Sequence, residues 1–150
     1  MLGRYLQENT SNANTKVHLL DSDAVAIECA AKNVSTKTQY QHLADCWRPQ
    51  TVGASEKKPH SYLSERKKFS MIVSNPPVHR GQPDDFRVLT KLVEGGASRL
   101  KKGGSLWIVS QEQIPVGVLL GKLKRQGVYS KVYCYKAAGG KFVCWRGIVQ

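Results

Sequence analysis

The apolar run Phe69-Ser70-Met71-Ile72-Val73-Ser74 leads directly into Asn75-Pro76-Pro77-Val78. The run has the length and composition of a buried strand. Two consecutive prolines fix φ and remove two backbone donors, so this segment can neither extend a strand ladder nor begin a helix. Two interpretations are open. The motif either simply ends a strand, as Asn-Pro and Pro-Pro often do, or it points the Asn75 amide and two carbonyls at a planar ligand that bears an amine.

Strands and helices alternate along the rest of the chain. The sequence predicts strands at residues 16–21, 40–43, 105–110, 128–135 and 141–149, helices at 24–33, 84–100 and 115–126, a turn at 102–104 and a hairpin turn at 137–140. This order predicts an α/β, doubly wound sheet with an antiparallel hairpin at its C-terminal edge. Ligands of such sheets bind beyond the carboxyl ends of the strands. Asp21, Asp45 and Asn75 each follow or end a predicted strand, so we expect them to converge on one crevice.

The charge balance points to a polyanionic partner. Lys and Arg number 23 against 11 Asp and Glu, which leaves a net charge of +12 on 150 residues. RNA or DNA is the simplest partner for such a chain, although charge also keeps a protein soluble or suits an acidic protein. We expect residues 1–150 to form a single domain, with an exposed basic loop at 47–68. That loop is either a solvated insertion or an arm that contacts RNA.

The cysteines indicate neither zinc nor disulfides. Cys29, Cys46, Cys134 and Cys144 form no Cys-x-x-Cys pair. We therefore predict no metal site, buried free thiols, and a reducing, intracellular setting. No apolar run has transmembrane length, so no membrane partner is expected.

The ordered set of motifs resembles the class I S-adenosylmethionine-dependent methyltransferases. It resembles more closely the ribosomal RNA small subunit methyltransferase C group, which modifies guanine N2. The resemblance is carried by residues 20–28, 43–45, 69–81, 100–109 and 141–143. It implies a Rossmann-like sheet, S-adenosylmethionine as cofactor, and RNA, specifically ribosomal RNA, as partner.

The resemblance also implies roles for single residues. Asp21 would accept hydrogen bonds from the ribose hydroxyls of the cofactor, and Asp45 would hold the adenine amino group. Asn75, Pro76 and Pro77 would form the catalytic motif that orients the amine of the target base. Val78, His79 and Arg80 would contact the substrate. The family usually has Phe or Tyr where Val78 stands, so base stacking would be weaker here or supplied by His79.

A second departure concerns the start of the fold. Family members begin with a strand and a glycine-rich loop around the methionine part of the cofactor, yet Gly3 is the only glycine before Gly53 here. The first central strand is therefore missing from the predicted sheet. Three explanations compete: a fragment of a longer enzyme, a partner chain that supplies the strand, or a degenerate methyltransferase kept as a non-catalytic RNA- or ribosome-associated protein. In each case we expect weak cofactor binding by this chain.

Overall fold

The computed structural model describes residues 18–21, 25, 29, 39–42, 68–76, 86–136 and 138–150. The chain divides into two compact units, Met1–Leu63 and Ser64–Gln150, which are described separately. In the first unit, β1 (His18–Asp21) and β2 (Gln39–His42) pair in parallel, from His18 opposite Gln39 to Asp21 opposite His42. Both strands were predicted from the sequence, with ends that differ by one or two residues.

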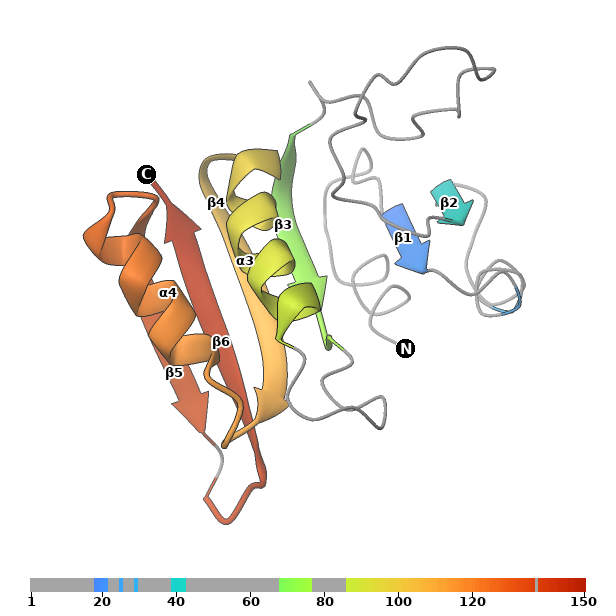
Figure 1. Ribbon diagram of the computed structural model, residues 1–150. Coiled ribbons are helices and arrows are strands. Elements are labelled where there is room, and N and C mark those ends of the chain that lie inside the picture. The colour runs from blue at the N-terminus through green and yellow to red at the C-terminus, as the bar shows by residue number, and fades with distance from the viewer. Residues whose placement is uncertain are drawn as a thin grey trace. The chain divides into compact units, whose positions relative to one another are not determined.

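The second unit contains a four-stranded sheet and two helices. Its elements are β3 (Phe69–Ser74), α3 (Arg87–Arg99), β4 (Leu100–Gln111), α4 (Val116–Arg125), β5 (Tyr129–Lys136) and β6 (Phe142–Val149). The strand order is β3-β4-β6-β5, in which β3 and β4 are parallel and β6 is antiparallel to both of its neighbours. Figure 1 shows α3 and α4 on the same face of this sheet. The predicted α/β sheet with a C-terminal antiparallel hairpin is confirmed.

The core of this unit lies between the sheet and its two helices. Alternation along β4 directs Leu106 and Ile108, both fully buried, toward the helices. The helices contribute the buried apolar residues Leu89, Leu92, Val93, Ala97, Val116, Leu120 and Leu123. Tyr129, at the start of β5, is also buried, and its hydroxyl donates a hydrogen bond to the Val93 carbonyl oxygen at 2.7 Å. This bond ties the hairpin to α3.

β4 begins earlier than the sequence predicts. Leu100 already pairs with Phe69, and the next pair joins Met71 to Ser105, so β3 advances two residues while β4 advances five. Gly103 has φ +73°, a conformation that costs glycine nothing but strains other residues. The prediction of a separate turn at 102–104 before the strand is therefore wrong. It is a bulge within β4, because the strand resumes its pairing with β3 after the three additional residues.

The prediction of buried thiols is wrong. Cys134 is exposed on β5, the last strand of the described sheet, whose neighbouring residues are open to solvent. Cys144 lies on β6 opposite Val109 and Tyr135, and it is only half-buried because this face of the sheet is the one that α3 and α4 do not cover. Cys29 is exposed as well, on a helical segment whose Val25, one turn earlier, is 66% exposed. Cys29, Cys134 and Cys144 form no disulfide among the described residues, and Cys46 lies outside them.

β3 also differs from a strand buried on both faces. Met71 and Val73 are 47% and 38% exposed, since only the opposite face of β3 is directed toward the helix layer. Within the described residues, no helix is long and apolar enough to cross a membrane.

Candidate functional site

Asn75 and Pro76 lie at the carboxyl end of β3. The last pair of the parallel ladder joins Ser74 to Ile108, and Asn75 is the next residue along the chain. Asn75 is exposed while Pro76 is buried. The Pro76 ring is thus packed into the second unit, while the Asn75 side chain is open to solvent.

Asp21 occupies the equivalent position in the first unit. It ends β1 and pairs with His42, the last residue of the parallel strand β2. Asp45, Pro77, Val78, His79 and Arg80 lie outside the described residues. The expected convergence of Asp21, Asp45 and Asn75 consequently stays a prediction.

An aromatic cluster that was not predicted from the sequence lies on the face of the sheet opposite α3 and α4. The rings of Trp107 and Tyr135 stack with centroids 5.7 Å apart, and Tyr133 lies 6.4 Å from Tyr135. The Arg146 guanidinium carbon lies 4.9 Å from the Trp107 ring centroid, a cation–π distance. These residues come from β4, β5 and β6. The spacing of Tyr133 and Tyr135 places both side chains on one face of β5. Their neighbours Trp107 and Arg146 follow only from the register between β4, β5 and β6.

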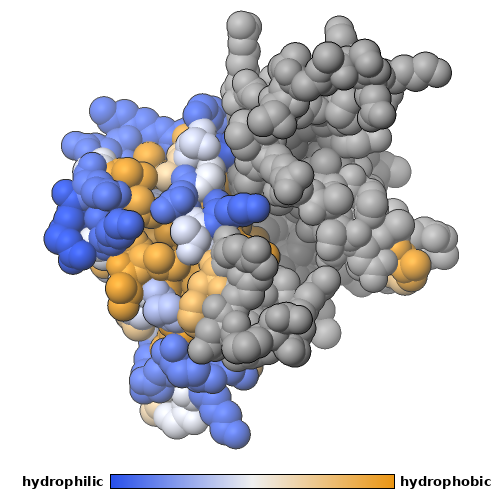
Figure 2. Space-filling model, in the orientation of Figure 1, coloured by the Kyte–Doolittle hydropathy of each residue, from blue (hydrophilic) through white to orange (hydrophobic). Residues whose placement is uncertain are grey.

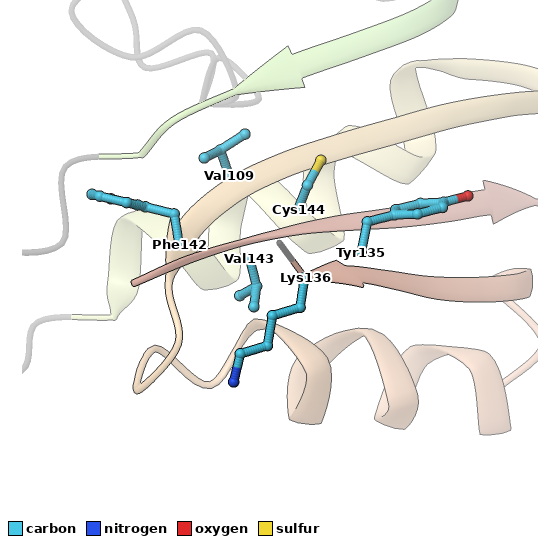
Figure 3. A pocket seen from close by; sticks show the side chains of 6 residues that line it. All are labelled: Val109, Tyr135, Lys136, Phe142, Val143 and Cys144. Atoms are coloured by element: carbon cyan, nitrogen blue, oxygen red, sulfur yellow. The ribbon is translucent and has the colours of Figure 1, made fainter. Parts of the chain in front are cut away.

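A shallow pocket of about 360 Å³ borders this cluster. It is lined by Val109, Tyr135, Lys136, Phe142, Val143 and Cys144. Figure 3 shows that these side chains project to both sides of β6 rather than toward one point. The Lys136 ammonium forms an ion pair with Glu112, whose carboxylate oxygen lies 2.6 Å away.

The Cys144 thiol in this pocket is not an activated nucleophile. Burial is the larger of two causes that raise the pKa of Cys144, and nearby Cys134 is the smaller. The thiolate is therefore disfavoured. The described residues also contain no group of three His, Cys, Asp or Glu that could hold a metal ion. Within the second unit, the candidate functional residue is Asn75 at the carboxyl end of β3. Asp21 ends β1 in the first unit.

Comparisons with known proteins identify the family and the fold of the chain. Residues 1–136 match the family model "Methyltransferase small domain". Ribosomal RNA small subunit methyltransferase C of Haemophilus influenzae is 31% identical over 120 residues, which cover 80% of this chain and 32% of that protein. The protein of the same name from Actinobacillus pleuropneumoniae serotype 5b is 39% identical over 107 residues, covering 71% of this chain and 29% of that protein. The chain thus spans about a third of the length of the curated relatives that it matches.

Solved structures show the same fold. The 16S rRNA N2 G1207 methyltransferase of T. thermophilus, solved with AdoMet and guanosine, matches with a TM-score of 0.63 at 21% identity, over 91% of this chain and 32% of that chain. A TehB-like SAM-dependent methyltransferase from Corynebacterium glutamicum matches with a TM-score of 0.61 at 16% identity, over 99% of this chain and 74% of that one. The Rossmann-like methyltransferase fold is therefore confirmed.

Proposed function

The chain belongs to the methyltransferase small domain family, and from this premise we propose that it is an rRNA guanine-N2 methyltransferase or the C-terminal part of one. The observation that carries the proposal is the exposed Asn75 and buried Pro76 at the carboxyl end of a parallel strand. That is the position at which open α/β sheets bind their ligands. The similarity to rRNA methyltransferases at 31% identity supports rRNA as the substrate class.

The motif has the chemistry that methylation of an exocyclic amine needs. The Asn75 side-chain oxygen and the Pro76 main-chain oxygen accept hydrogen bonds from the two N–H groups of the amine. These bonds turn the nitrogen lone pair out of the plane of the base and toward the methyl donor, which is catalysis by positioning. As the new N–C bond forms and the bond between the methyl group and the donor's sulfonium breaks, the same oxygens would stabilise the positive charge on nitrogen, and its extra proton would pass to water. Pro77 would add a second residue of fixed φ directly after Pro76.

S-Adenosylmethionine would supply the methyl group from its sulfonium centre when bound. The chain offers a hydrogen-bond acceptor that suits this cofactor, because Asp21, a carboxylate residue, ends a parallel strand. A carboxylate accepts two adjacent ribose hydroxyls well. Asp45 would hold the adenine amino group, and Val78, His79 and Arg80 would contact the target base and its phosphates.

A non-catalytic role is the second candidate function. Gly3 is the only glycine before Gly53, so a glycine loop for the methionine end of the cofactor is not present in these 150 residues. In this alternative the chain is an RNA- or ribosome-associated binding protein of methyltransferase descent. A partner chain that supplies a strand would reconcile the two candidates.

We retain three further expectations as proposals. Residues 1–150 form one domain, and 47–68 form an exposed basic loop, of which the structure describes Lys68. Cysteines that form no disulfide among the described residues, Cys134 and Cys144, fit a reducing, intracellular setting.

Methyl transfer from labelled S-adenosylmethionine to 16S rRNA tests the proposal directly. With the full chain, Asn75→Ala should reduce kcat at least about tenfold, because its amide acts on the geometry of the transition state. Its unfolding free energy should change little, since the side chain is exposed. Ser70→Ala, an exposed position near the opposite end of β3, is the matched control and should keep full turnover.

Equal turnover of the Asn75 variant and the wild type would remove Asn75 from the mechanism. RNA binding by a wild-type chain that transfers no methyl group, even with a strand-donating partner present, would favour the non-catalytic function.

A further inference from the structure

The end of the second unit opposite Asn75, called here the amino edge because the parallel strands begin there, carries basic residues from two elements, β4 and α4. β3 and β4 begin at this edge, and α3 and α4 end there (Figure 1). We call Lys101, Lys102, Lys122, Lys124 and Arg125 the amino-edge cluster. All five side chains are exposed. Figure 2 shows hydrophilic residues gathered where α4 ends.

The fold presents Lys101 and Lys102 through the bulge in β4. The bulge adds three residues between the Leu100–Phe69 and Ser105–Met71 pairs. β4 pairs with β6 only from Ser105 onward, so Lys101 and Lys102 lie before the part of β4 that pairs with β6. They lie outside any helix. Helix-dipole stabilisation, which accounts for basic residues in the last turn of α4, therefore does not account for them.

Carboxylates of the described part of this unit do not neutralise the cluster. The acidic residues described there are Glu94 and Glu112. Glu94 lies within α3, and Glu112 follows β4 at the opposite edge, where it pairs with Lys136. Lys68, next to the cluster in the fold, donates instead to the Ser98 carbonyl oxygen.

We propose that the amino-edge cluster binds the phosphate backbone of the RNA at a distance from the catalytic end. The inference rests on the proposed function for the identity of the polyanion. The six residues of β3 separate this edge from Asn75 by about 20 Å at ~3.3 Å per residue. A single rRNA helix or strand can span that distance. The cluster then adds affinity and orientation without reading bases, as phosphate contacts do.

The test compares two triple variants of the full chain that remove equal charge. The first variant combines Lys101→Gln, Lys102→Gln and Lys124→Gln, which removes three of the five positive charges of the amino-edge cluster. The control combines Lys91→Gln, Lys136→Gln and Lys141→Gln, all exposed positions outside it. Binding of a labelled 16S rRNA hairpin is measured without cofactor at several salt concentrations. Thermal unfolding of both variants verifies that they remain folded.

We expect the cluster variant to flatten the log-log salt slope by about two to three units, and the control by less than one. Equal changes of slope in the two variants would overturn the inference. Anionic phosphatidylserine vesicles provide a second arm. Loss of vesicle binding with an unaltered RNA slope would make the cluster a lipid site and also overturn it.

The outcome is separable from that of the proposed function. A flattened slope in a chain that transfers no methyl group supports the cluster and counts against the enzyme. Methyl transfer with an unaltered slope supports the enzyme and counts against the cluster.

Discussion

Tyr129 shows how one residue joins the hairpin to the helix layer. It is 1% exposed, its hydroxyl reaches the Val93 carbonyl oxygen, and its ring lies against Gly147. A Cβ on Gly147 would stand 2.8 Å from the ring, so the backbone of β6 approaches Tyr129 closely only because it carries no side chain there. The contact therefore depends on both residues.

Removing the hydroxyl should have a measurable cost. Tyr129→Phe keeps the ring and loses one buried hydrogen bond, so we expect the unfolding free energy to fall by about 0.5–1.5 kcal/mol. Urea denaturation at neutral pH measures it. Tyr135→Phe, at an exposed position, is the control and should change stability little.

The same hydroxyl should make stability depend on alkaline pH. Burial raises the pKa of Tyr129 well above its usual 10.0, so the folded protein keeps a proton that the unfolded chain releases. The stabilisation is complete below about pH 10 and is lost as pH rises above it. Urea midpoints between pH 8 and 11 should fall less steeply in Tyr129→Phe than in the wild type. Parallel curves for the two proteins would refute this linkage.

At the scale of elements, α4 is positioned by glycine as well as by its apolar stripe. A Cβ on Gly117 would overlap the ring of Trp145 on β6, whereas a Cβ on Gly121 would come no nearer than 4.0 Å to the Arg125 side chain. One glycine thus allows the helix to lie close to the sheet, and the other has open space.

These two glycines offer a matched pair of substitutions in one helix. Gly121→Ala should raise the unfolding free energy by up to about 1 kcal/mol, because alanine loses less backbone entropy. Gly117→Ala should lower it by about 1–3 kcal/mol, since the added methyl overpacks against Trp145. Thermal or urea denaturation distinguishes the two. A stabilised Gly117 variant would show that the contact between α4 and β6 is looser than described.

At the scale of the whole molecule, the chain covers about a third of its curated relatives, 32% in the Haemophilus influenzae protein. In our proposal Asp21 and Asp45 supply ribose and adenine contacts, without a glycine loop at the methionine end. We expect this chain to bind S-adenosylmethionine at least ~100-fold more weakly than an intact relative, a loss of about 2.7 kcal/mol.

Calorimetric titration with S-adenosylmethionine and S-adenosylhomocysteine measures this affinity. Asp21→Ala should weaken whatever binding remains. A low-micromolar dissociation constant for the 150-residue chain would contradict the prediction.

Several features were determined by the sequence alone. The alternation of elements, the hairpin with its turn at 137–140 and the strand that ends just before Asn75 were all predicted, since hydrophobic periodicity and proline chemistry act over a few neighbouring residues. The site was predicted only in part. Asn75, Pro76 and Asp21 lie at strand ends as expected, while Asp45, Pro77, Val78, His79 and Arg80 remain predictions.

Other features were decided by the tertiary structure. The bulge at Lys101, the exposure of Cys134, the stacking of Trp107 on Tyr135 and the amino-edge cluster depend on which strands are neighbours and in what register. Several of these contacts join residues far apart in the sequence, such as Phe69 with Leu100 and Trp107 with Tyr135. Local propensity carries no information about such pairings, because the free energy that selects them comes from packing the assembled sheet against its helices.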